Sequence, residues 1–165
     1  MKKTIKLLAV LSAVLLLSGC SAKGLSPEST IKAPGATGYY AGVQKALEQA
    51  VGKDIVLKYP LVNGRRSAFC SGDFNGSGKD EVLAFYQQKG EAAVTRMNLL
   101  SWDNGKWSSV QDIDPAGKEL LTADTSDLDL DGNFEILTGW QVSTAKTNQL
   151  CIYKMENGGL IQRAD

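Results

Sequence analysis

The feature that most constrains this chain is an acidic segment that occurs twice. Residues 127–137 read DLDLDGNFEIL, with carboxylates at every second position, then a glycine, then a fourth carboxylate. Residues 73–83 read DFNGSGKDEVL and follow the same plan 54 residues earlier in the chain. A plan repeated at such a period indicates that the same structural unit is built twice.

The sequence around the acidic segments predicts short strands. Predicted strands cover residues 55–59, 67–71, 82–87, 95–102, 107–112, 120–125, 135–141, 149–155 and 160–163. Asn-Gly pairs at 63–64, 104–105 and 157–158 are typical of tight hairpin turns. Each unit therefore reads as four antiparallel strands with an acidic loop after the first, which is typical of a β-propeller blade. We predict a mainly all-β fold with about two propeller-like blades, residues 67–112 and 121–165.

One helix is predicted before the strands. Tyr40, Val43, Leu47 and Val51 recur at helical spacing, and Gly52 follows them as a terminating residue. We expect this short amphipathic helix to pack against one edge of the domain, which would extend over residues 39–165.

The N-terminus predicts export and anchoring. Lys2, Lys3 and Lys6 precede an apolar run that is too short to span a bilayer. The run leads into LSGC at residues 17–20, which resembles the lipobox of bacterial lipoproteins. The resemblance implies that residues 1–19 are a signal peptide and that Cys20 becomes the lipidated N-terminus on the extracytoplasmic face of the membrane. Residues 20–38 then form a flexible tether. The alternative is an ordinary secretory signal with an incidental cysteine.

The charge balance excludes some functions. Without the three signal-peptide lysines, 15 basic side chains face 18 acidic ones, a net charge of −3. This is the wrong sign for general nucleic-acid binding. The chain also contains no histidine, and it therefore lacks the commonest general base and the commonest zinc ligand.

The two acidic segments resemble the calcium loops of FG-GAP/VCBS repeats, which form the propellers of integrin α subunits. The resemblance implies Ca²⁺ as the cofactor, and hard oxygen ligands in this pattern suit that ion. The implied ligands are Asp127, Asp129, Asp131, the carbonyl of Asn133, and Glu135, and in the first segment Asp73, Asn75, Ser77, the carbonyl of Lys79, and Glu81. The chain departs from the family in closing each loop with Glu instead of Asp and in placing Ser77 at a carboxylate position. The alternative is a pair of turns held by their own hydrogen bonds.

Three further groups of residues bear on function. Cys70 and Cys151 are predicted to be buried thiols and not a disulfide. Trp102, Trp107 and Trp140 would form either a carbohydrate platform or filling between sheets. Paired carboxylates are also found in glycosidases, although their grouping in calcium-type loops favours a role as ligands.

We therefore expect a membrane-anchored, extracytoplasmic, calcium-binding module with no catalytic activity that serves as a platform for a protein or glycan partner. The alternatives are an enzyme acting on cell-envelope glycans and a structural fragment of a longer repeat protein. Two blades do not close a propeller. We expect either further repeats beyond this sequence or self-association through an open sheet edge.

Overall fold

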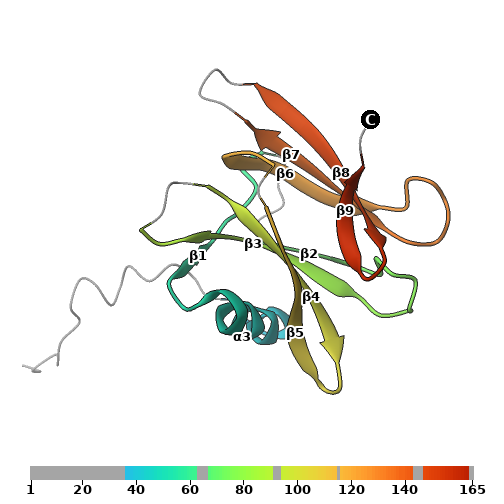
Figure 1. The fold of residues 1–165 in the computed structure, drawn as a ribbon, viewed down its shortest axis with the longest axis horizontal. Helices are drawn as coiled ribbons and strands as arrows, with labels where there is room; N and C mark the ends of the chain where they lie inside the picture. Colours follow the sequence, from blue (N-terminus) through green and yellow to red (C-terminus); the bar gives the residue numbers. More distant parts are fainter. Residues whose placement is uncertain (1–35, 63–66, 91–93, 115, 143–146, 164–165) are drawn as a thin grey trace, which may run out of the picture. The chain divides into compact units, whose positions relative to one another are not determined.

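The computed structural model describes residues 36–62, 67–90, 94–114, 116–142 and 147–163, all within one compact unit of the chain. Helix α3 is followed by nine strands (Figure 1). Their bounds are α3 Tyr39–Val51, β1 Ile55–Leu57, β2 Phe69–Gly72, β3 Glu81–Gln88, β4 Arg96–Asp103, β5 Lys106–Ile113, β6 Glu119–Ser126, β7 Glu135–Gln141, β8 Asn148–Glu156 and β9 Gly159–Arg163. The predicted helix and all nine predicted strands are confirmed, with differences of a few residues at their ends.

The strands form two antiparallel sheets. In the first sheet β3 pairs with β4, and β4 pairs with β5; β1 and β2 both pair with β3, at different positions along it. The second sheet has the order β6-β7-β8-β9. Four consecutive strands in simple up-and-down order therefore occur twice, as the repeat predicted, with β1 added to the first set.

The second sheet covers one face of the first. Side chains from both sheets share a single buried cluster, with Leu83 and Leu99 on one side and Ile136 and Trp140 on the other. The opposite face of the first sheet is covered by α3, whose Val43 and Leu47 pack with Val82 and Leu100. The order of layers is therefore helix, first sheet, second sheet (Figure 1). The helix forms the outermost layer on one side of the domain, where it covers a face of the first sheet.

The two sheets are stacked in the same sense. Val82 of the first repeat corresponds to Ile136 of the second, yet Val82 faces α3 whereas Ile136 faces the first sheet. Likewise, Leu83 lies between the sheets, whereas its counterpart Leu137 is on the outer face of the second sheet. Each repeat thus turns the same face toward the chain's N-terminal layers. The described residues form two open sheets and no closed ring of blades.

The Asn-Gly turns behave as their sequences require. Asn104 and Gly105 have φ of 50° and 79°, and Asn157 and Gly158 have φ of 51° and 82°. Positive φ at both central residues is the geometry of tight hairpins, and Asn and Gly adopt it at least cost. These turns join β4 to β5 and β8 to β9. The third predicted turn, at residues 63–64, lies outside the described residues.

Both described cysteines are buried in the cluster between the sheets. Cys70 is on β2 and Cys151 is on β8, and no disulfide links them. The prediction of two buried thiols is therefore confirmed. Among the three tryptophans, Trp140 is buried between the sheets and Trp107 packs under α3, while Trp102 remains partly exposed.

Candidate metal-binding loops

The second loop, residues 127–135, is folded by hydrogen bonds from its own backbone to its own carboxylates. Asp127 accepts hydrogen bonds from the amides of Asp131 at 3.1 Å and Gly132 at 3.0 Å. Asp131 accepts one from the amide of Asn133 at 2.9 Å. Asp side chains that bond amides a few residues later are a common means of closing a turn. Local sequence is therefore sufficient to shape this loop.

Glu135 closes the second loop from the start of β7. Its side chain is buried, with 3 % exposed, and Oε2 accepts a hydrogen bond of 2.8 Å from the amide of Leu128. Its other oxygen, Oε1, is buried and makes no hydrogen bond within the described part of the chain. A buried carboxylate oxygen in this state has a strong electrostatic requirement for a nearby cation.

Three carboxylates of the second loop converge. One oxygen each from Asp127, Asp129 and Glu135 lies within 4.8 Å of the others, a grouping able to hold a metal ion. Three of the five predicted ligands are therefore brought together. Asp131 lies outside this grouping, and the structure places the amide of Asn133 in a hydrogen bond to Asp131.

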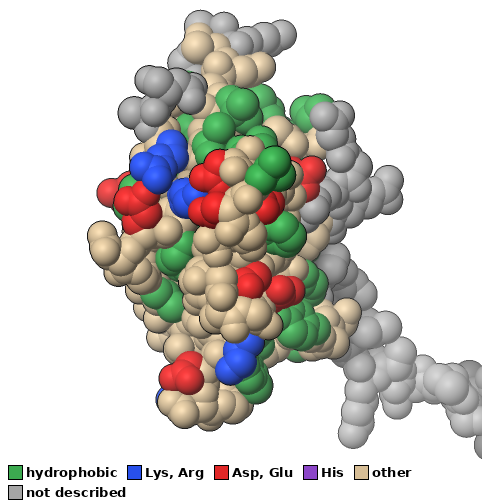
Figure 2. Space-filling view, turned by 90° about the vertical axis from the view of Figure 1, so that its right-hand side faces the viewer, with side chains coloured by type: hydrophobic (Ala, Val, Ile, Leu, Met, Phe, Trp, Pro, Cys, Tyr) green, Lys and Arg blue, Asp and Glu red, His purple; other side chains and the backbone are tan. Residues whose placement is uncertain are grey.

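A lysine from a neighbouring strand already supplies positive charge to this loop. The ammonium group of Lys154, on β8, forms ion pairs with Asp129 and, at 2.7 Å, with Asp131. It also lies 3.2 Å from Oε1 of Glu135. In the space-filling view, acidic side chains gather on this side of the molecule with basic side chains beside them (Figure 2). Lys154 thus serves as an internal counter-ion for three of the loop's carboxylates.

These contacts shift the protonation of both partners. The hydrogen bond from Lys154, together with the amide of Asn133, lowers the pKa of Asp131 below its ordinary value. Hydrogen bonds to Asp129 and Asp131 raise the pKa of Lys154. Both shifts favour the charged forms. Sequence reasoning missed Lys154. Ile136 on β7 pairs with Tyr153 on β8, so that the next residues, Glu135 and Lys154, lie side by side, and a prediction of this register would have shown it.

The first loop, residues 73–81, repeats the backbone geometry of the second. Asp73 accepts hydrogen bonds from the amides of Ser77 at 3.0 Å and Gly78 at 2.7 Å, as Asp127 does in the second loop. Glu81, 2 % exposed, accepts a hydrogen bond of 3.1 Å from the amide of Phe74, as Glu135 does from Leu128. Two loops with little identity outside their acidic positions therefore adopt the same fold.

The first loop differs in the partner of its buried glutamate, which is an uncharged amide and not an ammonium group. The side-chain amide of Asn75 donates a 2.7 Å hydrogen bond to Glu81 Oε1, and Asn75 Oδ1 accepts from the amide of Ser77. Burial is the main cause that raises the pKa of Glu81. Among the residues that the structure describes, no trio of acidic, cysteine or histidine side chains converges here. The described contacts of Asn75 and Ser77 are thus those of a hydrogen-bonded turn.

The two loops also touch each other. The amide of Phe134, in the second loop, donates a 3.0 Å hydrogen bond to the carbonyl of Asp73 in the first. The side chain of Asn133 lies so close to Gly76 that a Cβ at that position would be 2.4 Å from Asn133 Oδ1. Gly76 is therefore needed both for its positive φ of 71° and for this close approach.

A comparison of the chain with protein-family models, with curated proteins and with solved structures found no match. Within the described ranges, no helix combines the length and the apolar character needed to cross a membrane. The predicted signal peptide and Cys20 lie outside those ranges.

Proposed function

We propose that this protein is a membrane-anchored, extracytoplasmic binding module with no catalytic activity, whose propeller-like repeats carry a calcium site. The observation that supports it best is the second loop, where Asp127, Asp129 and Glu135 converge and the buried Oε1 of Glu135 has the Lys154 ammonium, 3.2 Å away, as its ion-pair partner. The donor set consists of carboxylate oxygens, which suits a hard divalent cation.

Calcium at the second loop would compete with Lys154. The ammonium group neutralises Asp129, Asp131 and Glu135, and an ion that uses these oxygens must displace it. The Lys154 side chain is 15 % exposed and has a flexible stem, so that its ammonium can turn out into solvent when calcium takes its place. We propose that the second loop holds either its own lysine or an external Ca²⁺, and that the first loop binds the ion more weakly because it offers fewer carboxylates.

Thermal unfolding of the purified soluble domain tests the calcium proposal. Extracellular calcium modules have dissociation constants of about 0.1–1 mM. At about 1 mM free calcium, such a site raises the free energy of unfolding by roughly 0.4–1.4 kcal/mol. The expected result is a melting temperature that rises with calcium and rises less with magnesium. If several millimolar calcium produced no calorimetric heat and no melting shift, the result would contradict the calcium site and leave both loops as hydrogen-bonded turns.

Two matched variants assign the calcium response to a loop. Asp129→Ala should remove most of the calcium-dependent stabilisation, because Asp129 belongs to the convergent group. Asn75→Ala, in the first loop, should remove less of it. Equal responses in both variants would contradict the assignment to the second loop.

The anchoring part of the proposal is tested at Cys20. Cys20→Ser removes the thiol that would be lipidated, and two acyl chains are what makes such anchoring stable. The variant should be found unprocessed or released from the membrane fraction. Normal processing with retention in the membrane would contradict a lipid anchor.

We propose further that the module associates through the outer face of its second sheet. The edges of this sheet are partly occupied, because Gln111 bonds both backbone groups of Leu160, and the amides of residues 61–62 donate to β6. The outer face instead presents a hollow of about 440 Å³ beside Leu121 and Leu150, and Leu150 is 59 % exposed. The counterpart of this face in the first sheet is buried under the second sheet.

The occupant we propose is a second copy of the chain. The outer face of the first sheet is covered by α3, whereas the outer face of the second sheet has no such layer among the described residues and is the apolar sheet surface that a second copy can offer, which favours a symmetric pair. Sedimentation should show dimers that Leu150→Lys abolishes and that Val110→Lys, an exposed site on β5, leaves intact. A monomer at all accessible concentrations would contradict self-association.

A further inference from the structure

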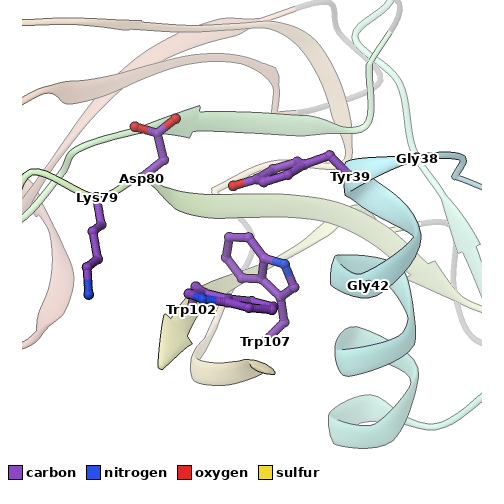
Figure 3. A pocket seen from close by; sticks show the side chains of 7 residues that line it. All are labelled: Gly38, Tyr39, Gly42, Lys79, Asp80, Trp102 and Trp107. Carbon is purple, nitrogen blue, oxygen red and sulfur yellow. The ribbon is translucent and has the colours of Figure 1, made fainter. Parts of the chain in front are cut away.

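A cleft of about 620 Å³ opens beside the N-terminus of α3, away from the carboxylate cluster of the second loop. Its walls come from three elements: the first turn of α3, the end of the first loop, and the β4–β5 hairpin. The side chains that line it are those of Tyr39, Lys79, Asp80, Trp102 and Trp107; in Figure 3 the Asp80 carboxylate points up, away from the two indoles, and Lys79 extends down. This volume lies within the usual range for small-molecule sites, about 300–1,000 Å³.

The aromatic wall of the cleft is rigid. Trp107 is buried under α3, where Gly42 permits an approach so close that an added Cβ would meet its ring at 3.1 Å. Trp102 packs edge-to-face on Trp107 with ring centroids 5.6 Å apart, and Tyr39 does the same from the other side at 5.4 Å. Trp102 is 44 % exposed, so that a flat aromatic surface is held in place and open to the cleft. Because these side chains are already held in place, a ligand that stacks on them costs little further side-chain entropy.

The facing wall of the cleft carries both signs of charge. Lys79 and Asp80 stand across from the aromatic rings, and the hydroxyl of Tyr39 points toward Asp80 (Figure 3). Lysine offers only donors and an ionised aspartate only acceptors. The cleft therefore combines one flat apolar surface with donors and acceptors at its rim.

The repeat does not require this arrangement. At the positions that correspond to Lys79, Asp80 and Trp102, the second repeat has Asn133, Phe134 and Met155. The second repeat nevertheless forms the same four strands and the same hairpin turn. The polar pair and the exposed indole thus belong to the first repeat alone, and the blade fold does not account for them.

We propose that this cleft binds a saccharide, with one sugar ring stacked on Trp102 and its hydroxyl groups bonded to Asp80 and Lys79. A pyranose ring has an apolar face of C–H bonds and a rim of hydroxyls that both donate and accept, which matches the two walls. A quaternary ammonium ligand would also favour aromatic rings, but Lys79 would repel it. The inference deepens the proposed role as a binding module by giving its ligand class, and rests on that role.

The contacts differ in their expected contributions. The indole of Trp102 supplies most of the apolar contact area, so that Trp102→Ala should weaken saccharide binding about tenfold or more. Asp80→Asn keeps the size of the side chain and removes its charge, which should weaken binding about threefold. Asp80 is exposed, and Asp80→Asn should keep the melting temperature of the wild type. Trp102→Ala loses the edge-to-face contact with Trp107 and should lower the melting temperature slightly while the domain stays folded.

Ligand-observed NMR and calorimetry on the soluble domain test the proposal with three probes: the N-acetylglucosamine trimer, cellotriose and maltotriose. At least one should bind saturably to the wild type and to Tyr59→Ala, which removes an exposed aromatic ring outside the cleft. Trp102→Ala and Asp80→Asn should weaken that binding in the order given. Choline is titrated in parallel as the cationic alternative.

Three results would overturn the saccharide site. They are no response to any of the three saccharides, equal saccharide affinity in the wild type and Trp102→Ala, and binding of choline without saccharide. Each titration is run with calcium and with EDTA. If the protein binds saccharide but does not respond to calcium, only the calcium proposal is wrong. If it responds to calcium but binds no saccharide, only the saccharide proposal is wrong.

Discussion

The first and second loops share one backbone design but differ in how their charge is neutralised. In both, an aspartate accepts two amides of the turn, and a buried glutamate accepts a third. In the first loop the glutamate is bonded by the neutral amide of Asn75. In the second, Asp129, Asp131 and Glu135 share the single ammonium of Lys154, which offsets only part of their negative charge.

This difference separates two requirements that the acidic motif combines. The turn itself needs the aspartate, the glutamate and residues able to adopt positive φ, because these features are common to both loops. The additional carboxylates of the second loop, Asp129 and Asp131, have no acidic counterpart in the first loop, and they create a demand for a cation. A residue on the next strand decides how the demand is met: the position that follows the last paired residue is Ser101 after Leu100 in one sheet and Lys154 after Tyr153 in the other, and Lys154 forms an ion pair with Glu135.

The largest expected effect is the loss of a closing glutamate. Glu81→Ala should lower the free energy of unfolding by about 2–3 kcal/mol, because it leaves the buried amide of Phe74 and the side chain of Asn75 without their acceptor. Chemical denaturation measures the change, and the exposed neighbour variant Asp80→Ala should change stability by less than about 0.5 kcal/mol. A Glu81→Ala protein as stable as the wild type would show that the loop closes without its glutamate.

Removal of Lys154 should make the second loop depend more strongly on calcium. Lys154→Met should lower the melting temperature in EDTA, because three carboxylates lose their counter-ion, and should enlarge the stabilisation by calcium. Ser101→Lys, which places an ammonium across from Glu81, should leave the calcium response of the second loop unchanged. A smaller calcium response in Lys154→Met than in the wild type would contradict competition between lysine and ion.

Acid should affect the two loops in opposite directions when EDTA is present. The pKa of Glu81 is raised in the folded protein, so its contribution to stability is full below the unfolded value and is lost as the pH rises through the folded one. The pKa of Asp131 is lowered, so its contribution is present above its unfolded value and is lost as the pH falls through the folded one.

Denaturation at several pH values tests this contrast. On acidification from about pH 7 to about pH 4, the wild type should gain stability relative to Glu81→Gln. Below about pH 4 it should lose stability relative to Asp131→Asn. Parallel curves for the two variants would show that the loops do not differ in this respect.

The smallest effect concerns Leu130, which takes the place that Gly76 has in the first loop. Leu130 has a φ of 60° and is 86 % exposed, so its side chain does not repay the strain of a left-handed conformation. Leu130→Asn should raise the free energy of unfolding by about 0.5–1 kcal/mol, because asparagine tolerates this region. Leu128→Asn, an exposed site two residues earlier, is the control and should bring no gain. A destabilised Leu130→Asn protein would mean that the exposed leucine makes a stabilising contact.

The sequence by itself determined the local structure of this protein. Alternation of apolar residues, the Asn-Gly pairs and the 54-residue period predicted every described strand, the helix, the hairpin turns and the grouping of strands into two units of four. These features depend on the conformational preferences of neighbouring residues and on pairing between consecutive strands. The same is true of the turn in each acidic loop, where the hydrogen bonds from backbone amides to carboxylates join residues at most seven positions apart.

Only the tertiary structure decided how the repeats meet and what their charges face. The register between β7 and β8 brought Lys154, 19 residues beyond Glu135, to the carboxylates of the second loop. The packing of α3 placed Tyr39 beside Trp107, and the two rings form one wall of the cleft that Asp80 also lines. Such contacts depend on the packing of whole layers, because burial of apolar faces fixes which sheet covers which and carries distant polar side chains along with it.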